Sequence, residues 1–301
     1  MSDDLELITI GRVGVDLYPE QIGVPLADVR TFRKMLGGSP TNVAVAAARL
    51  GRRTTVLTKV GADGFGDYVR TALEEFGVDA SLVGTDATLR TPLAFCEIHP
   101  PNDFPLLFYR EPTAPDLQLS GADFAAAPID DVPLLWMTGT GLSREPSRSA
   151  TLAALQRRGR RAHTVFDLDY RPMLWEEDAR RFYREAASYA TVLVGNREEW
   201  GVLGSPPSGV ELTIEKLGPD GVSGTRAGET VVVPPVEVEV VNGLGAGDAF
   251  GGALCHGLLA GWELEKLLRF ANAAGAIVAS RLGCADEMPS LAEVEELLCA
   301  A

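Results

Sequence analysis

The chain has few basic residues for its length. Of its 301 residues, 27 are Lys or Arg and 42 are Asp or Glu, so its formal net charge is −15 at pH 7. Proteins that bind nucleic acids need a basic surface that neutralises phosphates, so we expect no nucleic-acid partner. The densest basic run, Arg157–Arg161, is typical of a helix C-terminus, where cations suit the helix dipole.

Long apolar runs are missing, and cysteine and histidine are scarce. No apolar run reaches the roughly 18 residues of a membrane-spanning helix, and the acidic start is unlike a signal peptide. We therefore expect no membrane partner and a cytoplasmic location. The four cysteines form no CxxC pair and the three histidines no HExxH motif, which favours buried thiols over a zinc site or a disulfide framework. The cysteines are Cys96, Cys255, Cys284 and Cys299.

Apolar segments with strand and helix patterns alternate along most of the chain. Strands are predicted at 5–10, 54–60, 134–138, 164–168, 191–194, 212–217 and 230–241. Helices are predicted at 39–50, 67–76, 147–158, 179–188, 246–260, 264–281 and 291–299, the first with Ser39 as its cap and Pro40 at its first position. This alternation predicts an α/β fold with a mostly parallel central sheet flanked by helices. Ligands bind such sheets at the carboxyl ends of the strands.

Two segments, about 13–36 and 91–111, depart from this alternation. The second contains two strand-like runs, Pro92–Ile98 and Leu106–Arg110, on either side of a turn cluster at 100–103. We expect the two segments to pair as a small β lid over the carboxyl edge, within a single domain of residues 1–301. The lid strands could also join two copies of the chain in a homodimer by edge pairing.

A glycine-rich stretch at 242–250 carries the strongest chemical signal. Glycines at 243, 245 and 247 let backbone amides converge at the start of a helix, where they form an anion site. Asp248 lies in the first turn of that helix, where a carboxylate can take a proton from a hydroxyl that attacks a phosphate. A helix cap in a glycine-rich turn is the alternative interpretation.

A second glycine turn lies at 37–42. Its adjacent glycines permit close approach of a ligand, and Asn42 can offer a donor and an acceptor to a polyol; taken alone, this turn is better explained as a capped helix start. The chain has no GxxxxGK[ST] motif and no GxGxxG after its first strand, which argues against P-loop NTPases and dinucleotide-binding enzymes.

The two glycine motifs, in this order and at this separation, resemble those of the ribokinase-like (PfkB) carbohydrate kinases. Residues 37–44 match the first motif of that family and 245–250 the second, while Asn196–Glu199 matches its NxxE element and Lys216–Gly221 its turn over the nucleotide. The resemblance covers almost the whole chain. It implies an ATP-dependent kinase that uses Mg2+ to phosphorylate a sugar hydroxyl.

Further stretches are similar to one branch of the family, which phosphorylates the 6-hydroxyl of 5-dehydro-2-deoxy-D-gluconate in myo-inositol catabolism. They include 12–19, 109–110, 139–142, 167–172 and 287–289. Kinases of 2-keto-3-deoxygluconate share several of these stretches, and fructokinase is a further alternative. A sugar-acid-binding regulator on a kinase fold is the non-enzyme alternative, against which the intact Asp248 and glycine turn argue.

The resemblance implies a role for each motif residue. Asp248 would be the base, and the amides of Gly245, Ala246 and Gly247 would stabilise the transferring phosphoryl group. Substrate contacts fall to Asp16, Gly37, Gly38, Asn42, Arg110, Asp169 and Arg171, the two arginines facing the acid end because a guanidinium pairs well with a carboxylate. Nucleotide contacts fall to Asn196, Lys216, Gly218, Gly221 and Asn272, and water-mediated magnesium contacts to Asn196 and Glu199.

Two departures from the family pattern bear on the site. The chain has Asn242-Gly243-Leu244 where the family commonly has Asp-Thr-Thr before the glycine turn. Carbonyls of Asn242, Leu244 and Gly283 could still hold a monovalent cation, but the missing Asp charge predicts weak or absent activation by K+. Asp169 stands where many sugar kinases carry Asn, and this adds a negative charge whose role the sequence does not explain.

Overall fold

The computed structural model describes residues 5–300 and arranges their strands in two sheets. The larger sheet has the order β13-β12-β11-β10-β9-β8-β1-β4-β5. Neighbours from β5 to β11 are parallel, and β12 and β13 continue the sheet in antiparallel pairing. This architecture confirms the predicted fold class. The strands are β1 Leu7–Ile10, β4 Thr54–Gly61, β5 Val83–Asp86, β8 Leu134–Thr138, β9 His163–Asp167, β10 Val192–Asn196, β11 Leu212–Lys216, β12 Val222–Arg226 and β13 Glu229–Val233.

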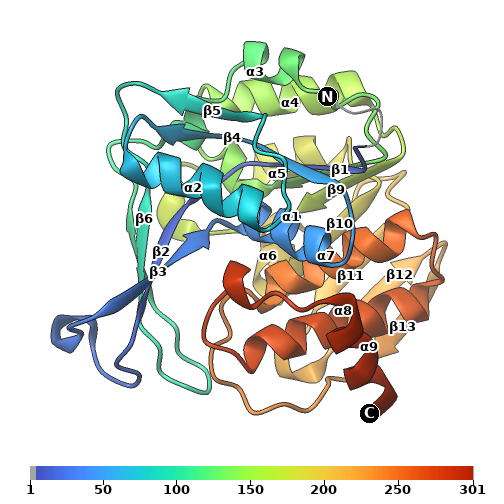
Figure 1. Ribbon diagram of the computed structural model, residues 1–301. Helices are drawn as coiled ribbons and strands as arrows, with labels where there is room; N and C mark the ends of the chain where they lie inside the picture. Colours follow the sequence, from blue (N-terminus) through green and yellow to red (C-terminus); the bar gives the residue numbers. More distant parts are fainter. Residues whose placement is uncertain (1–4, 301) are drawn as a thin grey trace.

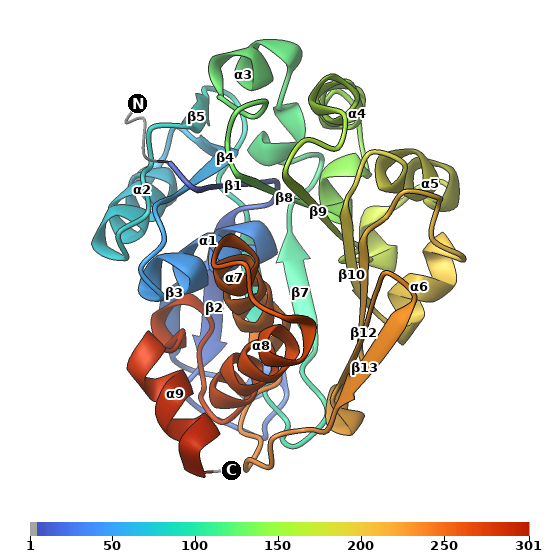
Figure 2. The same cartoon turned by 90° about the vertical axis from the view of Figure 1, so that its right-hand side faces the viewer.

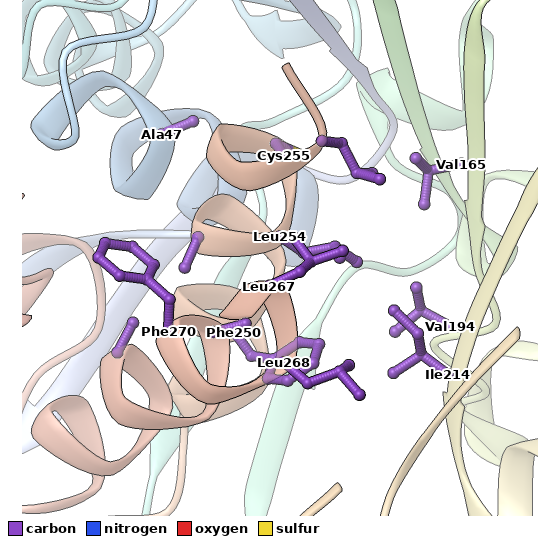
Figure 3. Close-up of a cluster of buried hydrophobic side chains, with 14 of the residues drawn as sticks. Ala47, Val165, Val194, Ile214, Phe250, Leu254, Cys255, Leu267, Leu268 and Phe270 are labelled. Carbon is purple, nitrogen blue, oxygen red and sulfur yellow. The ribbon is translucent and has the colours of Figure 1, made fainter. Parts of the chain in front are cut away.

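Helices cover both faces of the larger sheet (Figures 1 and 2). One face carries α1 Ser39–Arg49, α2 Gly64–Glu75, α7 Ala246–Leu259 and α8 Leu264–Ala279, with α9 Leu291–Ala300 packed on α8. The other face carries α3 Gly121–Ala126, α4 Ser147–Arg158, α5 Arg180–Ala187 and α6 Arg197–Leu203. Figure 3 shows the first core, where Leu254 and Leu268 lie opposite Val165, Val194 and Ile214 of the strands. Burial of these apolar side chains is the main force that fixes α7, and with it the glycine turn, against the sheet.

The smaller sheet has the order β3-β2-β6-β7 and is built from the two segments that depart from the alternating pattern. Its strands are β2 Gly14–Pro19, β3 Phe32–Gly37, β6 Leu93–Cys96 and β7 Leu106–Tyr109. The β2–β3 and β6–β7 pairs are antiparallel, and the central β2–β6 pair, which joins the two segments, is parallel. In Figure 1 this sheet projects from the helices at the lower left.

Several predicted boundaries were wrong for local reasons. The strand predicted at 230–241 ends at Val233, because Pro234 and Pro235 follow and cannot donate ladder hydrogen bonds, so the glycine turn does not follow a strand. Helix α2 starts at Gly64, three residues before the predicted position, because Asp63 accepts the amide of Gly66 at 2.9 Å. The sequence analysis missed β5, β12, α3 and α6, which are short.

The basic run does end a helix, as predicted. Helix α4 stops at Arg158, and Gly159 follows with a left-handed φ of 61°. Arg158 is fully buried and donates hydrogen bonds to the carbonyls of Val132 and His163, at 3.0 and 3.1 Å. It therefore ties α4 to the sheet.

Three of the four cysteines are buried as predicted, but Cys299 is exposed, because the last helix packs with one side against the protein. No group of three or more acidic, histidine or cysteine side chains suited to a metal ion occurs within residues 5–300. No helix in this part of the chain is long and apolar enough to cross a membrane.

Candidate active site

Two cavities adjoin at the glycine turn that precedes α7. The smaller one lies between the smaller sheet, the start of α1 and the start of α7, and the larger one has a volume of about 550 Å³. They are called the sugar pocket and the nucleotide cavity below, after the ligands that the resemblance to the kinases implies. Gly245 lines the first, and Ala246 and Gly247 line the second. The sugar pocket is lined by Arg12, Asp16, Tyr18, Gly38, Ser39, Asn42, Ala94, Leu106, Phe108, Arg171, Leu244, Gly245, Asp248 and Cys284.

Asp248 reaches the sugar pocket from the first turn of α7. Gly245 precedes that helix with a φ of 83°, a left-handed conformation that glycine adopts at little cost. Ser39 donates its hydroxyl to Oδ1 of Asp248 at 2.7 Å, and Asn42 donates Nδ2 to Oδ2 at 2.8 Å. Burial raises the pKa of the Asp248 carboxyl, and the hydrogen bonds from Asn42 and Ser39 lower it in part. Both carboxylate oxygens are thus oriented by the start of α1.

These hydrogen bonds change the predicted roles of Ser39 and Asn42. Ser39 is the first residue of α1 and not its cap, since the cap position is Gly38 and no side chain caps the helix. Asn42, predicted to hold substrate hydroxyls, gives its amide to Asp248. Its Oδ1 is buried and accepts no hydrogen bond from residues 5–300. Asn42 therefore faces both the carboxylate and the pocket.

Gly37 and Gly38 leave room for their neighbours in the pocket wall. A Cβ on Gly37 would overlap the carboxylate of Asp16, and one on Gly38 would overlap the carbonyl of Arg12. Gly38 also has a φ of 105°, which L-residues rarely adopt. Burial raises the pKa of the Asp16 carboxyl to about 6. The sequence predicted these three residues together, and the structure brings them together.

The nucleotide cavity lies among β11, α7 and α8. Four residues were predicted to contact the nucleotide from the 216–221 turn and from α8. All four line this cavity: Lys216, Gly218, Gly221 and Asn272. The Lys216 ammonium lies 3.5 Å from the position that a Cβ on Gly247 would take, so it stands beside the glycine turn. It also pairs with Oδ1 of Asp167 at 3.6 Å. Burial raises the pKa of the Asp167 carboxyl to about 8, although Lys216 opposes the shift.

Asn196 and Glu199 form a reciprocal pair at the start of α6. Oδ1 of Asn196 accepts the amide of Glu199 at 2.9 Å, and Oε2 of Glu199 accepts the amide of Asn196 at 2.7 Å. Neither is among the lining residues of the two cavities. Asn196 is the last residue of β10, and it lies beside Lys216, the last residue of the neighbouring strand β11. Magnesium binds to proteins through one or two carboxylates and keeps several waters, so Glu199 and the buried Asp167 are donors of the right kind for such an ion.

The predicted acid-binding arginines lie in different surroundings. Arg171 lines the sugar pocket, and its Nε is 3.2 Å from Oδ1 of Asp169, a nearly buried carboxylate. Arg110 is buried, forms an ion pair with Asp116 at 2.7 Å, and lines a small cavity together with Arg12, Asp16 and Phe108. It is not among the lining residues of the sugar pocket, whereas Arg171 is.

The loop before α7 is closed by a side chain. Asn242 is fully buried; its Nδ2 donates to the carbonyl of Leu282 at 2.6 Å, and its Oδ1 accepts the amide of Leu244 at 3.0 Å. Gly283 follows Leu282, and a Cβ there would crowd Met35. The amide of Asn242 therefore joins the two loops whose carbonyls were predicted to hold a monovalent cation.

Sequence reasoning missed four residues of the sugar pocket that carry polar or ionisable side chains, as well as the apolar Ala94, Leu106 and Phe108. Arg12 follows β1, and the order of strands in a parallel sheet could have placed it at the ligand edge. Ser39 was read as a cap. Tyr18 and Cys284 meet in the pocket wall with 2.7 Å between Oη and Sγ, and no signal in the sequence pairs residues so far apart.

Known carbohydrate kinases are similar to this chain in sequence and in fold. Residues 4–291 match the model of the pfkB family carbohydrate kinases. A 5-dehydro-2-deoxygluconokinase from Geobacillus kaustophilus is 34% identical over 314 residues, covering 98% of this chain and 93% of the relative. An uncharacterized sugar kinase from Pyrococcus horikoshii in complex with ATP is 28% identical with a TM-score of 0.85, covering 97% of this chain and 99% of that one. Fructokinase with bound ATP from Xylella fastidiosa is 28% identical with a TM-score of 0.84, each chain being 99% covered.

Proposed function

The chain belongs to the pfkB family of carbohydrate kinases, and from this premise we propose that its sugar substrate is a sugar acid. The preferred substrate is 5-dehydro-2-deoxy-D-gluconate, phosphorylated at its 6-hydroxyl in myo-inositol catabolism. ATP is the phosphoryl donor, as expected for a sugar kinase with ATP-bound structural relatives. The observation that carries the proposal is one pocket with a carboxylate, Asp248, and an arginine, Arg171, among its lining residues.

In this proposal the substrate lies with its hydroxyl end at Asp248 and its acid end at Arg171. Asp16 accepts hydrogen bonds from sugar hydroxyls, beside Gly37 and Gly38. Asp248 takes the proton of the attacking 6-hydroxyl, and Ser39 and Asn42 hold its carboxylate toward that hydroxyl. A positioned base of this kind contributes typically ~10²–10⁴-fold to a rate.

ATP lies in the nucleotide cavity with its phosphates at the glycine turn. The amides of Gly245, Ala246 and Gly247, at the start of α7, stabilise charge on the transferring phosphoryl group. Lys216 stands beside Gly247 and adds a positive charge there. Magnesium would neutralise phosphate charge, and Glu199 and Asn196 would hold it through its water shell. Positioning and electrostatics then account for most of the catalysis.

We further propose that residues 1–301 form one cytoplasmic kinase domain whose smaller sheet acts as a lid. Asp16 of β2 and Phe108 of β7 line the sugar pocket from that sheet. Closing it over the substrate would exclude water and limit wasteful hydrolysis of ATP.

A coupled assay of ADP release tests the substrate. The sugars to compare are 5-dehydro-2-deoxygluconate, 2-keto-3-deoxygluconate, fructose and ribose, each at a range of concentrations with saturating ATP. We expect the highest kcat/KM with 5-dehydro-2-deoxygluconate. Preference for 2-keto-3-deoxygluconate would keep the acid class and change the substrate, whereas preference for fructose or ribose would reject the proposal.

A further inference from the structure

Arg12 has a fixed backbone at the carboxyl end of β1. Its carbonyl packs against Gly38, where no side chain would fit, and accepts a hydrogen bond from Oγ1 of Thr41 at 3.2 Å. Both neighbours belong to the start of α1, the same segment that orients Asp248. The side chain of Arg12 therefore begins from a defined point next to the proposed catalytic centre.

The guanidinium of Arg12 lines the sugar pocket with an unused donor. The side chain is 11% exposed, and its Nε is buried and forms no hydrogen bond with the part of the chain that the structure describes. Its carbon Cζ lies 5.4 Å from the centre of the Phe108 ring. Nη2 is 4.0 Å from Oδ2 of Asp169, which is an ion-pair distance but too long for a hydrogen bond. A buried N–H without an acceptor costs free energy, and a ligand in the pocket could supply the acceptor.

Asp169 connects Arg12 to Arg171. One carboxylate oxygen faces Arg12, and the other lies 3.2 Å from Nε of Arg171. Asp169 is 3% exposed and has a φ of 32°, so both its backbone and its carboxylate are fixed. Both guanidinium groups lie beside this one carboxylate, and the carboxylates of Asp16 and Asp248 line the same pocket. This gives the extra charge at position 169 a role: an uncharged Asn there would remove the carboxylate that lies beside both arginines.

We propose that Arg12 is a further arginine that binds the carboxylate of the substrate. Arg12 and Arg171 bind the acid end together, and Asp169 is a positioning residue that keeps both guanidinium groups in place. The inference rests on the proposed sugar-acid function, and it assigns selectivity for acids over neutral sugars to a residue outside the glycine motifs.

The test is Arg12→Met, which keeps the length of the side chain and removes its charge. We expect kcat/KM for the sugar acid to fall about 30-fold or more, as for other charge pairs that lose one partner, while kcat/KM for fructose changes by less than about threefold. The KM for ATP should stay as in the wild type. For Arg12→Lys, kcat/KM for the sugar acid should lie between the values for the wild type and Arg12→Met, because lysine keeps the charge and loses the planar fork. This variant also provides the readout if Arg12→Met does not fold.

The matched control is Arg52→Met. Arg52 is similarly shielded, at 17% exposure, and pairs with Glu6 at 2.9 Å outside both cavities, so its loss should leave the selectivity unchanged. An equal loss of activity on the acid and on fructose in Arg12→Met, or a wild-type KM for the acid, would overturn the inference.

Calorimetric binding of D-gluconate separates this inference from the proposed function. If the wild type phosphorylates no sugar acid but binds gluconate, and Arg12→Met weakens that binding, the function is wrong and the carboxylate site stands. If the wild type phosphorylates the acid and Arg12→Met leaves its KM unchanged, the function stands and the inference fails. If the wild type neither phosphorylates nor binds any sugar acid, both fail.

Discussion

At the residue scale, Asp248 is a better candidate base in the structure than its sequence position alone suggests. A helix cap directs its carboxylate to its own backbone amides, but both oxygens of Asp248 accept hydrogen bonds from side chains of another helix. Those donors come from residues 39 and 42, more than 200 positions away. A carboxylate held in this way in a pocket wall suits proton transfer better than helix capping.

Asp248→Asn tests this role, since it keeps the shape of the side chain but removes its basicity. We expect kcat to fall by ~10²–10⁴-fold, with the KM for ATP and the melting temperature almost unchanged. Asn and Asp are comparable caps, so a purely structural Asp248 would tolerate the change. Retention of more than about a tenth of kcat would contradict the assignment, given the loss expected for a general base.

The pH profile adds a second readout to the same variant. Burial raises the pKa of Asp248 above its ordinary value, and a base acts only when it has lost its proton. The rate of the wild type should therefore rise with pH through that raised pKa. Asp248→Asn should lose this acid limb along with its activity, and a limb that persists unchanged would assign it to another group.

At the element scale, most strand and helix positions could be predicted from the sequence, but the partners of single side chains could not. The alternating pattern predicted the mostly parallel sheet, and the resemblance to the kinases implied that Asp16, Gly37, Gly38 and Asp248 share one site; the structure brings them together. The run at 230–241 is rich in valine and was predicted as one strand, although its two prolines end the ladder at Val233. That prediction gave more weight to the pattern of valines than to the two prolines.

The errors in the site share one cause. Ser39 stands before Pro40 at a helix start, so local rules make it a cap, yet its hydroxyl serves a carboxylate in α7. Arg110, predicted from a motif, also pairs with Asp116, six residues on, and no local pattern indicates that partner. Arg12 opens a stretch that is similar to one branch of the family, but its place at the pocket follows from the end of β1. Local patterns determine elements, and tertiary contacts determine which charges remain available to a ligand.

The loop before α7 leads to a prediction on monovalent cations. The side-chain amide of Asn242 already connects this loop to Leu282, so a bound cation would stabilise the loop less. We expect the wild-type rate to change by less than about twofold when K+ replaces tetramethylammonium, since no carboxylate charge at position 242 favours the ion. Asn242→Asp should lower the rate without K+ and create activation by K+. Several-fold activation of the wild type would show that backbone carbonyls suffice.

At the scale of the whole molecule, the smaller sheet touches both cavities. Asp16 and Phe108 line the sugar pocket, and the tip of the β6–β7 hairpin places Asn102 at the nucleotide cavity and Phe104 against Gly243. A movement of this sheet would therefore alter both sites together. The other face of this sheet points away from the sugar pocket and carries exposed apolar side chains.

That outer face is the proposed surface of a homodimer. The ring of Phe95 lies 5.3 Å from that of Phe32 and 5.4 Å from that of Tyr109, and Leu107 and Tyr109 are 47% and 60% exposed. They lie on β7, an edge strand of the sheet. Exposed apolar residues on an open strand edge favour pairing with a second copy.

We expect light scattering after gel filtration to give twice the chain mass of 32.1 kDa. The double variant Leu107→Ser with Tyr109→Ser should run as a monomer, because it removes the apolar contact while leaving the ladder hydrogen bonds of β7 with β6 intact. Val232→Ser is the matched control: it is 63% exposed on β13, the edge strand of the other sheet, and should remain dimeric. A monomeric wild type at micromolar concentration would reject the dimer, and a dimeric double variant would move its interface away from this sheet.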